Sequence, residues 1–560
     1  MAKIVKKKKK KLGGGFSGGG GGKIESPYRP YGVIKRPPCG SNCPNYNPIR
    51  KMLMTIQKAE DHGKPYEQAF QEAFYIFLEK QPFPSICGRV CPHPCQSECN
   101  RNAKEGAVEI NKVERFIGDY GLKKNLPAKM LTEEARSEKV AIIGSGPGGM
   151  SCAYHLARRG YKVTVFEAFP KAGGMLRYGI PDYRLPVDIL DAEYKRVLDM
   201  GVELKLNTSI GNDITLDDLR KDYDAIFTAI GAHKGLKLRV EGEDAPNVFT
   251  GTDFLHRVNA GEKVDVGDSV VVIGGGDTAI DAARVAKRLG AEATILYRRT
   301  KTEMPAIDEE IEGALAEDVK IHFLAAPIEI YKDGDKATGM KCQRMELGEP
   351  DSSGRRRPVP IEGDTFDLNF TTLIAAISQE PDFKGFEHLI EGRDWIKVDD
   401  KFMTKEEKHY SGGDNVNLGL VIDAIFHGRR AAHAIHERYS GEKMPDDPPN
   451  LPLITSDKMQ LSYYEKREPT EIKEMPVAER LKSLDAEIIA TWSEEEAIKE
   501  AKRCMSCGDC FECGTCWSYC QDSAVIKPLE KGKPYTFKLE FCTGCKKCAE
   551  NCPCGYIDMK

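Results

Sequence analysis

Residues 140–149 read Val-Ala-Ile-Ile-Gly-Ser-Gly-Pro-Gly-Gly, a short apolar run followed directly by a glycine-rich loop. The apolar run predicts a buried strand, and the residues after the loop, Met150 to Arg159, predict a helix. A second apolar run, Val163 to Phe166, ends in Glu167. A strand, a G-x-G-x-x-G loop, a helix and an acid after the next strand form the dinucleotide-binding fingerprint, which predicts a Rossmann-like domain.

The glycines and the acid of this fingerprint each have a physical role. Glycine allows the tight turn at the first position, the close approach of a pyrophosphate at the second, and helix–strand packing at the third. Backbone N–H groups at the helix start receive the phosphate charge, and the acid accepts a hydrogen bond from a ribose 2′-OH. The predicted binding residues are Gly144, Gly146, Pro147, Gly149 and Glu167.

A second glycine loop follows the apolar run Val270 to Ile273, but the strand after it ends in Arg298 and Arg299, not in an acid. Two guanidinium groups bind a 2′-phosphate that a carboxylate would repel, so this loop favours NADPH over NADH. The alternative is that both arginines are solvated surface charges. The predicted binding residues of this loop are Gly274, Gly276, Asp277, Thr278 and Ala279.

Two nucleotide folds in one chain predict two ligands, FAD and a nicotinamide nucleotide. In two-dinucleotide flavoproteins a late Asp binds the ribityl or pyrophosphate part of FAD, and the next helix directs its N-terminus toward the flavin. Gly413 and Asp414, before a helix expected from Leu418 to Arg430, match this pattern. Ala229 and Gly231 match the return crossing of the same FAD domain.

The chain is therefore expected to have an α/β core with helical and cysteine-rich domains on either side. Its 560 residues, 40% hydrophobic and 30% charged, are typical of a globular protein with several domains. The predicted ranges are 1–30 for a flexible basic tail, 31–135 for a helical iron-sulfur domain, 136–265 and 366–440 for the FAD domain, 266–365 for the NAD(P)H domain, 441–500 for a linker and 501–560 for a ferredoxin domain.

Charge and hydropathy exclude several classes of protein. No apolar run approaches the roughly 18 residues of a membrane span, so none is expected. The N-terminal lysines are followed by glycines, where a secretory signal would have an apolar stretch, so we expect a cytoplasmic protein. The basic charge lies on this glycine-rich tail and the rest is acidic, so nucleic acid is not expected as a partner.

The cysteines indicate iron-sulfur clusters, because 17 of the 19 fall in two regularly spaced blocks. The C-terminal block contains two runs with the bacterial ferredoxin spacing, in which the fourth cysteine of each run ligates the other cluster. Zinc normally takes separated C-x2-C pairs and is disfavoured. Cys504, Cys507 and Cys554 are left over, although Cys504 and Cys507 offer an alternative register. The two predicted 4Fe-4S ligand sets are Cys510, Cys513, Cys516 with Cys552, and Cys542, Cys545, Cys548 with Cys520.

The N-terminal block is also typical of clusters, but six thiols cannot supply two four-ligand clusters alone. His93, between two prolines, is interpreted as a turn residue rather than a ligand. Cys152 and Cys342 are interpreted as small core residues. The cysteines of this block are Cys39, Cys43, Cys87, Cys91, Cys95 and Cys99.

Across about residues 31–440 the chain resembles the family of the bacterial glutamate synthase small (β) subunit. The electron-bifurcating NADH-dependent ferredoxin:NADP oxidoreductase large subunit and the N-terminal half of dihydropyrimidine dehydrogenase share this family. With its C-terminal block, the whole chain is similar to the DsrL-type iron-sulfur flavoproteins of dissimilatory sulfite reductase systems. The motifs that carry the resemblance are Cys87-Gly88-Arg89-Val90-Cys91-Pro92, the two glycine loops, Ala172-Gly173-Gly174-Met175-Leu176, Tyr178-Gly179-Ile180-Pro181 and Tyr297-Arg298-Arg299.

The resemblance implies further site residues. It adds Gly174 and Met175 to the FAD site. It assigns Cys43, Cys91, Cys95 and Cys99 to one N-terminal cluster, and Cys39 and Glu114 to the other, with Glu114 as an oxygen ligand. The chain departs from the family here, because relatives have a C-x2-C before the position of Cys39 and this sequence has none; Cys87 is a substitute. An iron count near 16 per chain, against 12, would separate four clusters from three.

These features predict an oxidoreductase in which the cofactors do the chemistry, with no acid–base pair or nucleophile from the protein. Hydride passes between NAD(P)H and FAD, and single electrons pass through three to four 4Fe-4S clusters to or from a protein partner. Dissimilatory sulfite reductase and a ferredoxin are the candidate partners, and a homodimer is considered. The alternatives are a glutamate synthase-type small subunit and a non-catalytic electron-transfer subunit. A disulfide reductase is disfavoured, because Cys152 is the one cysteine of the FAD portion.

Overall fold

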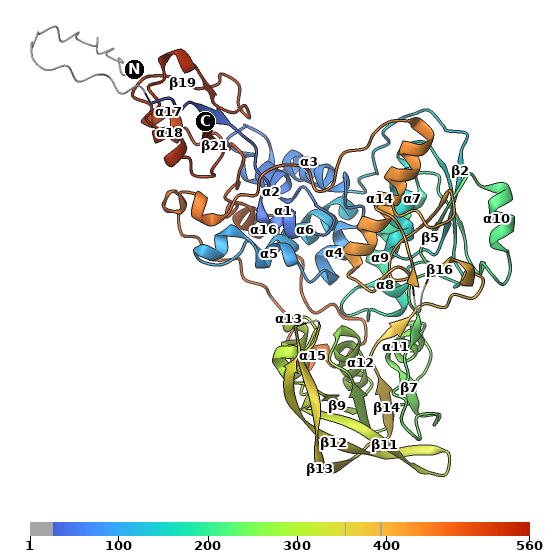
Figure 1. The fold of residues 1–560 in the computed structure, drawn as a ribbon. Helices are drawn as coiled ribbons and strands as arrows, with labels where there is room; N and C mark the ends of the chain where they lie inside the picture. The colour runs from blue at the N-terminus through green and yellow to red at the C-terminus, as the bar shows by residue number, and fades with distance from the viewer. Residues whose placement is uncertain (1–25, 353, 392–394) are drawn as a thin grey trace, which may run out of the picture.

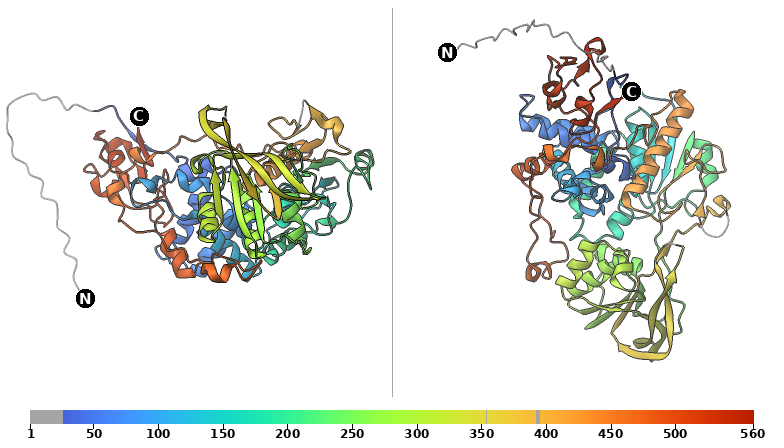
Figure 2. Two further views of the ribbon diagram at one scale, coloured as in Figure 1. Left: turned by 90° about the horizontal axis from the view of Figure 1, so that it is seen from below. Right: turned by 60° about the vertical axis from the view of Figure 1, so that its left-hand side comes forward.

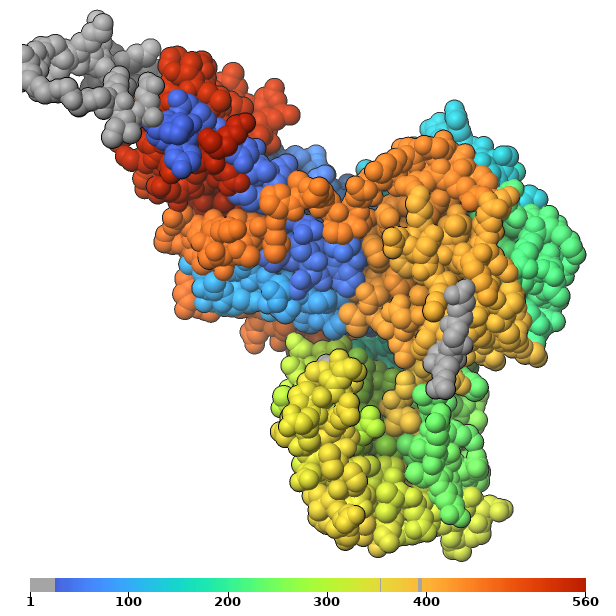
Figure 3. All heavy atoms as spheres, viewed as in Figure 1, coloured from blue at the N-terminus to red at the C-terminus, as the bar shows by residue number. Residues whose placement is uncertain are grey.

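The computed structural model describes residues 26–352, 354–391 and 395–560. It has four parts, namely a helical N-terminal domain, two α/β domains and a small C-terminal unit (Figure 1). The second α/β domain forms a lobe below the other parts (Figure 3). Residues 1–25 of the predicted basic tail lie outside the described residues.

The first α/β domain is built on a parallel sheet with the strand order β18-β5-β2-β3-β4. The two strands of the fingerprint, β2 (Lys139–Ile143) and β3 (Lys162–Phe166), lie inside it, because four of the five side chains in each are buried. Helices α7 (Pro147–Ala157) and α14 (Val421–Ser440) pack against each other beside this sheet. The remaining strands are β4 (Glu203–Lys205), β5 (Ala225–Thr228) and β18 (His409–Ser411).

The second α/β domain repeats this architecture with the parallel order β10-β9-β8-β14-β7. Its glycine loop joins β8 (Ser269–Ile273) to α12 (Asp277–Arg288). Strands β7 (Val248–Thr250) and β14 (Thr372–Ala375) belong to this sheet but lie outside the range 266–365 predicted for the domain. Backbone pairing of β14 with both β8 and β7 places them here, which their short sequences do not reveal. The other strands are β9 (Glu292–Tyr297) and β10 (Lys320–Phe323).

Three antiparallel strands cover the outer side of this lobe (Figure 1). Apolar side chains from β11 (Ala325–Asp333) and β12 (Lys336–Pro350) close a second core against the parallel sheet. Cys342 is fully buried in this core, as a small core residue. The third strand, β13 (Arg356–Asn369), completes the ribbon.

The helical N-terminal domain shares one hydrophobic core with the first α/β domain. Helix α3 (Tyr66–Leu78) contributes three buried phenylalanines, and Tyr154 of α7 donates a hydrogen bond to the carbonyl oxygen of Leu78 at 3.0 Å. A shared core makes these two domains one packed body. The other main helices are α2 (Ile49–Gln57), α4 (Pro84–Val90) and α6 (Ile110–Lys123).

Both ends of the described chain meet in the C-terminal unit. Strand β1 (Pro30–Gly32) pairs antiparallel with β21 (Ile557–Met559). Between them in sequence, the predicted linker reaches down to the second α/β domain at α15 (Val477–Arg480) and returns to α16 (Glu494–Ala501) beside the helical domain (Figure 2). The segment is packed along its course; for example, the Arg115 guanidinium donates to the Ile489 carbonyl oxygen at 2.5 Å.

Candidate functional site

One cavity of about 1160 Å³ extends between the two α/β domains. The first loop contributes Ser145 and Gly146 to its wall, and the second contributes Asp277 and Thr278. Each loop follows the carboxyl end of a parallel strand, where open α/β sheets bind nucleotides. Ligand pockets commonly measure about 300–1,000 Å³, so this cavity has room for more than one small molecule.

The two glycine loops are built in the same way. Gly144 has φ +98°, and a Cβ there would lie 2.2 Å from the carbonyl oxygen of Ala229. Gly274 has φ +150°, and its Cβ would lie 2.2 Å from that of Ala376. Gly146 differs, because nothing lies within 4 Å of its Cβ position, which faces the cavity. This open space is where the backbone can approach a pyrophosphate.

Other predicted loop residues support these turns. Pro147 begins α7 and lines the cavity. Gly149 and Ala279 are buried beneath their loops, and Gly276 caps α12. Gly149, Gly276 and Ala279 shape the loops but do not line the cavity.

Glu167 lies at the cavity edge and is 4% exposed. Its Oε2 accepts a hydrogen bond from the Ser145 backbone N–H at 3.0 Å, and its Oε1 accepts one from Phe169 N–H at 2.9 Å. Each carboxylate oxygen is therefore oriented by the backbone. A charge held in this way can accept from a ribose hydroxyl without further rearrangement.

The predicted residues from the rest of the first domain converge on the same cavity. Burial raises the pKa of Asp414 to about 6, and its Oδ1 accepts a hydrogen bond from Gly419 N–H at 3.2 Å. The first turn of α14 reaches the wall through Val421 and Ala424, so its positive end faces the cavity. The other wall residues from the prediction are Gly174, Met175, Ala229, Gly231 and Gly413.

The arginine pair after β9 is not assembled as predicted. Arg299 is 4% exposed, and its guanidinium pairs with Asp351 at 2.7 Å and donates to the Arg356 carbonyl oxygen at 2.7 Å. Arg298 is exposed, and neither arginine lines the cavity. Asp351 therefore holds Arg299 away from the cavity in this structure, and the binding of one 2′-phosphate by both arginines stays a prediction.

The C-terminal cysteines form two groups. Cys510, Cys513, Cys516 and Cys552, the first set predicted from spacing, line one small cavity, and Cys554, which the spacing left over, lines it as well. In the second set, burial raises the pKa of Cys548 to about 11, and the nearby Cys542 and Cys545 thiols add to it. Cys520 follows α17 (Thr515–Tyr519), which packs against α18 (Lys547–Glu550), the helix that contains Cys548.

The two runs also repeat in backbone geometry. Glu512 and Gly514 have φ values of +64° and +77°, and the corresponding Gly544 and Lys546 have +73° and +65°. In each run these two residues flank the second cysteine in the sequence. The duplication seen in sequence is therefore a duplication of structure.

The N-terminal cysteines group differently from the predicted sets. Glu114 lies near the thiols of Cys43, Cys87, Cys91 and Cys95, and burial, followed by Glu193, raises its pKa well above the usual range. Its Oε1 is buried without a hydrogen-bond partner. A buried acceptor without a partner is costly, so the carboxylate oxygen fits a ligand to a metal.

Cys99 does not join that group. It lines a separate cavity with Cys39, Cys504 and Cys507, so both predicted N-terminal sets need correction. The four-residue spacing of the cysteines continues from Cys87 to Cys99. The short helix that contains Cys95 ends before Cys99, however, and Cys99 therefore lies apart from the other cysteines of the run. His93 has φ +42° between its two prolines, in agreement with a turn residue.

In the described part of the chain, no three His, Cys, Asp or Glu side chains converge tightly enough for a single metal ion. The cysteines instead surround cavities. A cubane cluster suits this arrangement, because each thiolate binds a different iron from outside the cube.

Comparison with protein families identifies the core of the chain. A family model described as pyridine nucleotide-disulphide oxidoreductase matches residues 138–432, more than half of the chain. The chain belongs to this family. A second model, dihydropyrimidine dehydrogenase domain II, 4Fe-4S cluster, matches residues 33–126.

The similarity of this chain to known proteins extends beyond the matched core. The chain is 36% identical over 512 residues to NADPH-Fe(3+) oxidoreductase subunit beta of Geobacter sulfurreducens, covering 84% of this chain and 75% of that protein. It is 36% identical over 516 residues to NADP(+)-dependent formate dehydrogenase subunit beta of Moorella thermoacetica, covering 86% and 71%. The glutamate synthase [NADPH] small chain of Escherichia coli is 35% identical over 423 residues, covering 71% and 88%.

The predicted enzyme class and cofactors are confirmed. The protein is an FAD-dependent NAD(P)H oxidoreductase that passes electrons among NAD(P)H, FAD and 4Fe-4S clusters. The disulfide chemistry in the family name has no residues here, because Cys152 is the one cysteine of the FAD portion and is fully buried. Within the described residues, no helix has the length and apolar character to cross a bilayer.

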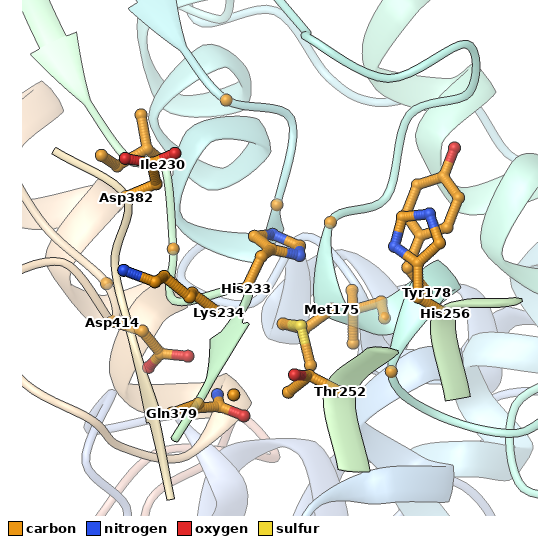
Figure 4. A pocket seen from close by; sticks show the side chains of 18 of the residues that line it. Met175, Tyr178, Ile230, His233, Lys234, Thr252, His256, Gln379, Asp382 and Asp414 are labelled. Atoms are coloured by element: carbon orange, nitrogen blue, oxygen red, sulfur yellow. The ribbon is translucent and has the colours of Figure 1, made fainter. Parts of the chain in front are cut away.

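This family member also has an aromatic group in the cavity wall that sequence reasoning missed. The rings of Tyr178 and His256 stack with centroids 4.5 Å apart (Figure 4). The ring centroid of Phe169 lies 4.8 Å from that of Tyr178. His233 lies nearby, and burial, with a smaller effect of His256, lowers its pKa to about 4. Tyr178 was part of a quoted motif, but nothing in the sequence pointed to His256, which α11 (Gly251–Asn259) brings in from the other domain.

Proposed function

We propose that this chain is the NAD(P)H-oxidising subunit of a redox complex and exchanges electrons with a protein partner. The observation that carries the proposal is the single cavity lined by both glycine loops and by Val90 and Pro92, the neighbours of Cys91. The two loops proposed for the nicotinamide and the flavin therefore border one space, and the neighbours of Cys91 in sequence form part of its wall. This arrangement supports a short path from NAD(P)H through FAD to the N-terminal clusters.

The chain's own residues fit FAD at the first loop. The open side of Gly146 and the start of α7 accept the pyrophosphate, and Glu167 is positioned for the ribose. Asp414 and the N-terminal turn of α14 lie at the other end of the site. When bound, FAD accepts a hydride and releases electrons one at a time. The protein contributes orientation and excludes water with the aromatic group around Tyr178.

We assign one N-terminal cluster to Cys43, Cys91, Cys95 and Glu114, with Cys87 as the alternative fourth ligand. The unpaired Oε1 of Glu114 supports an oxygen ligand, since that atom has no protein donor. Because Val90 and Pro92 line the cavity, we propose that this cluster is the first one beside the flavin.

We further propose that the C-terminal unit is a two-cluster ferredoxin domain and the site of exchange with the partner. Cys545 is exposed, and Trp517, Tyr519 and Phe541 are more than half exposed around the second cysteine set. Exposed aromatics beside an exposed cluster ligand suit a protein acceptor. Dissimilatory sulfite reductase and a ferredoxin are the candidates, the former through the resemblance to DsrL-type flavoproteins.

For the nicotinamide nucleotide we propose NADPH. The relatives named above carry NADPH or NADP in their names, and Arg298 is exposed at the end of β9 beside the second loop. A single arginine can still favour a 2′-phosphate over a hydroxyl, with a smaller preference than a pair.

Anaerobic stopped-flow spectroscopy tests the proposed function. NADPH should bleach the flavin absorbance of the isolated chain within milliseconds to seconds, followed by slower bleaching of the clusters. If NADPH leaves the flavin oxidised, the chain is a scaffold for electron transfer and the proposal fails. Glutamate formation after adding a glutamate synthase large subunit would instead favour that alternative.

A further inference from the structure

Four cysteines that no single sequence motif joins line one small cavity. Cys39 and Cys99 come from the helical domain, and Cys504 and Cys507 come from the segment after α16. Burial raises the pKa of Cys39, and the thiols of Cys99, Cys507 and Cys504 add to it in that order. The four side chains are therefore close neighbours, although more than 400 residues separate the two pairs in sequence.

The helical domain holds the backbone of the C-terminal pair directly. The Arg50 guanidinium donates to the Cys507 carbonyl oxygen at 2.5 Å and to the Lys35 carbonyl oxygen at 2.7 Å. The Gln57 amide donates to the Cys504 carbonyl oxygen at 3.1 Å. Both polar side chains come from α2, so the C-x2-C segment is fixed at two points against the domain that carries the other two thiols.

A buried network anchors the same segment from its other side. Arg503 is completely buried and donates to the carbonyl oxygens of Ala107 at 2.5 Å and Gly106 at 2.9 Å. Glu500 accepts hydrogen bonds from the backbone N–H groups of Glu109 at 2.8 Å and Thr470 at 2.8 Å. A buried charge pair can specify one conformation of the chain, and here the pair fixes the position of the residues before Cys504.

We propose that Cys39, Cys99, Cys504 and Cys507 hold a 4Fe-4S cluster that joins the helical domain to the C-terminal unit. Four thiols around a cavity, none of them in a disulfide, provide the complete ligand set of a cubane. The site leaves both ferredoxin-type sets intact, since neither uses Cys504 or Cys507. Its position is between the other sites, because Cys39 neighbours Cys95, and Tyr464 lies near both Cys507 and Cys513.

The first test removes the C-terminal pair. The double variant Cys504→Ala/Cys507→Ala should lose about four irons and about four acid-labile sulfides per chain, from about 16 to about 12, and one of the S = 1/2 EPR signals of the dithionite-reduced protein. Cys342→Ala is the matched control, because Cys342 is equally buried but lies in the second α/β lobe, and it should change neither value. An unchanged iron and sulfide content in the double variant overturns the proposal.

A second test needs no variant and uses the full-length holoprotein. Under anaerobic conditions, iodoacetamide labelling read by mass spectrometry should leave Cys39, Cys99, Cys504 and Cys507 unmodified, and should label all four after iron is removed with a chelator. Labelling of Cys504 and Cys507 in the holoprotein, at the rate seen after chelation, overturns the proposal. Flavin bleaching by NADPH is followed in the same samples, so that failure of this site is distinguished from failure of the proposed oxidoreductase function.

Discussion

The two glycine loops have the same backbone but different surroundings. In each, the first glycine has a positive φ, and its Cβ would lie 2.2 Å from a carbonyl oxygen on a neighbouring segment. After the next strand, however, Glu167 is directed to its loop, while Arg299 is held by Asp351 away from the cavity. The shared geometry explains why both domains can bind a nucleotide, and the difference in charge explains how they can bind different ones.

The largest effect is expected from Gly144→Ala. The added Cβ would meet the Ala229 carbonyl oxygen in a backbone region that alanine disfavours, so we expect a loss of at least about 3 kcal/mol of folding stability and no bound FAD. The measurements are the flavin-to-protein ratio and the thermal unfolding midpoint.

Gly146→Ala is the matched control, because its Cβ meets nothing within 4 Å. Without FAD, the Gly146→Ala variant should unfold at the same temperature as FAD-free wild-type protein. It should nevertheless bind FAD more weakly, because the methyl group fills the space for the pyrophosphate. Equal behaviour of the two variants would contradict the assigned roles.

Gly274→Ala applies the same change to the second loop. The flavin should stay bound, while its reduction by NADPH should slow by about 100-fold or more, because the Ala376 carbonyl oxygen leaves no room for the new methyl group. Stopped-flow bleaching with NADPH measures the loss, and photoreduction of the flavin checks that FAD is intact. Normal bleaching by NADPH would show that hydride does not enter through this loop.

Replacing the arginines separately sharpens the difference in charge. Arg298→Ala should raise KM for NADPH about tenfold and leave KM for NADH unchanged, because a charge-assisted hydrogen bond is worth about 1.5 kcal/mol. Arg299→Ala should chiefly lower stability, because it leaves Asp351 without that guanidinium. If Arg299→Ala alone abolishes the NADPH preference, the nucleotide rearranges this region on binding.

The smallest effect concerns pH. Burial raises the pKa of Asp414 in the folded protein to about 6, so the folded state binds a proton more tightly than the unfolded state. The stability of FAD-free protein should therefore fall as pH rises from about 4 to about 6, by up to about 2 kcal/mol. Asp414→Asn should remove this dependence and bind FAD more weakly. Chemical denaturation at pH 4.5 and 7 measures the free energy of unfolding at each pH. The same change in this free energy in the wild-type protein and in the variant would exclude Asp414 as the cause.

Local patterns predicted most of the nucleotide site. The strand, glycine loop and acid around Gly144 lie within about 30 residues, so their spacing predicts the turn, which the structure has, and a ribose contact, which stays a prediction. The two ferredoxin-type runs are similarly compact, and the first set predicted from their spacing lines one cavity together with Cys554, while the second set stays a prediction. The boundaries of the second α/β domain were missed, because β7 and β14 are three and four residues long and are assigned by pairing with β8.

The sequence by itself determined the class of this protein: two nucleotide loops, an FAD-type return motif and cysteines in cluster spacing. These depend on backbone conformations that neighbouring residues impose. Only the tertiary structure decided which distant groups meet, namely Cys99 with Cys504, Arg299 with Asp351, and His256 with Tyr178. Such contacts arise from the packing of whole domains, and the spacing of residues along the chain does not predict them.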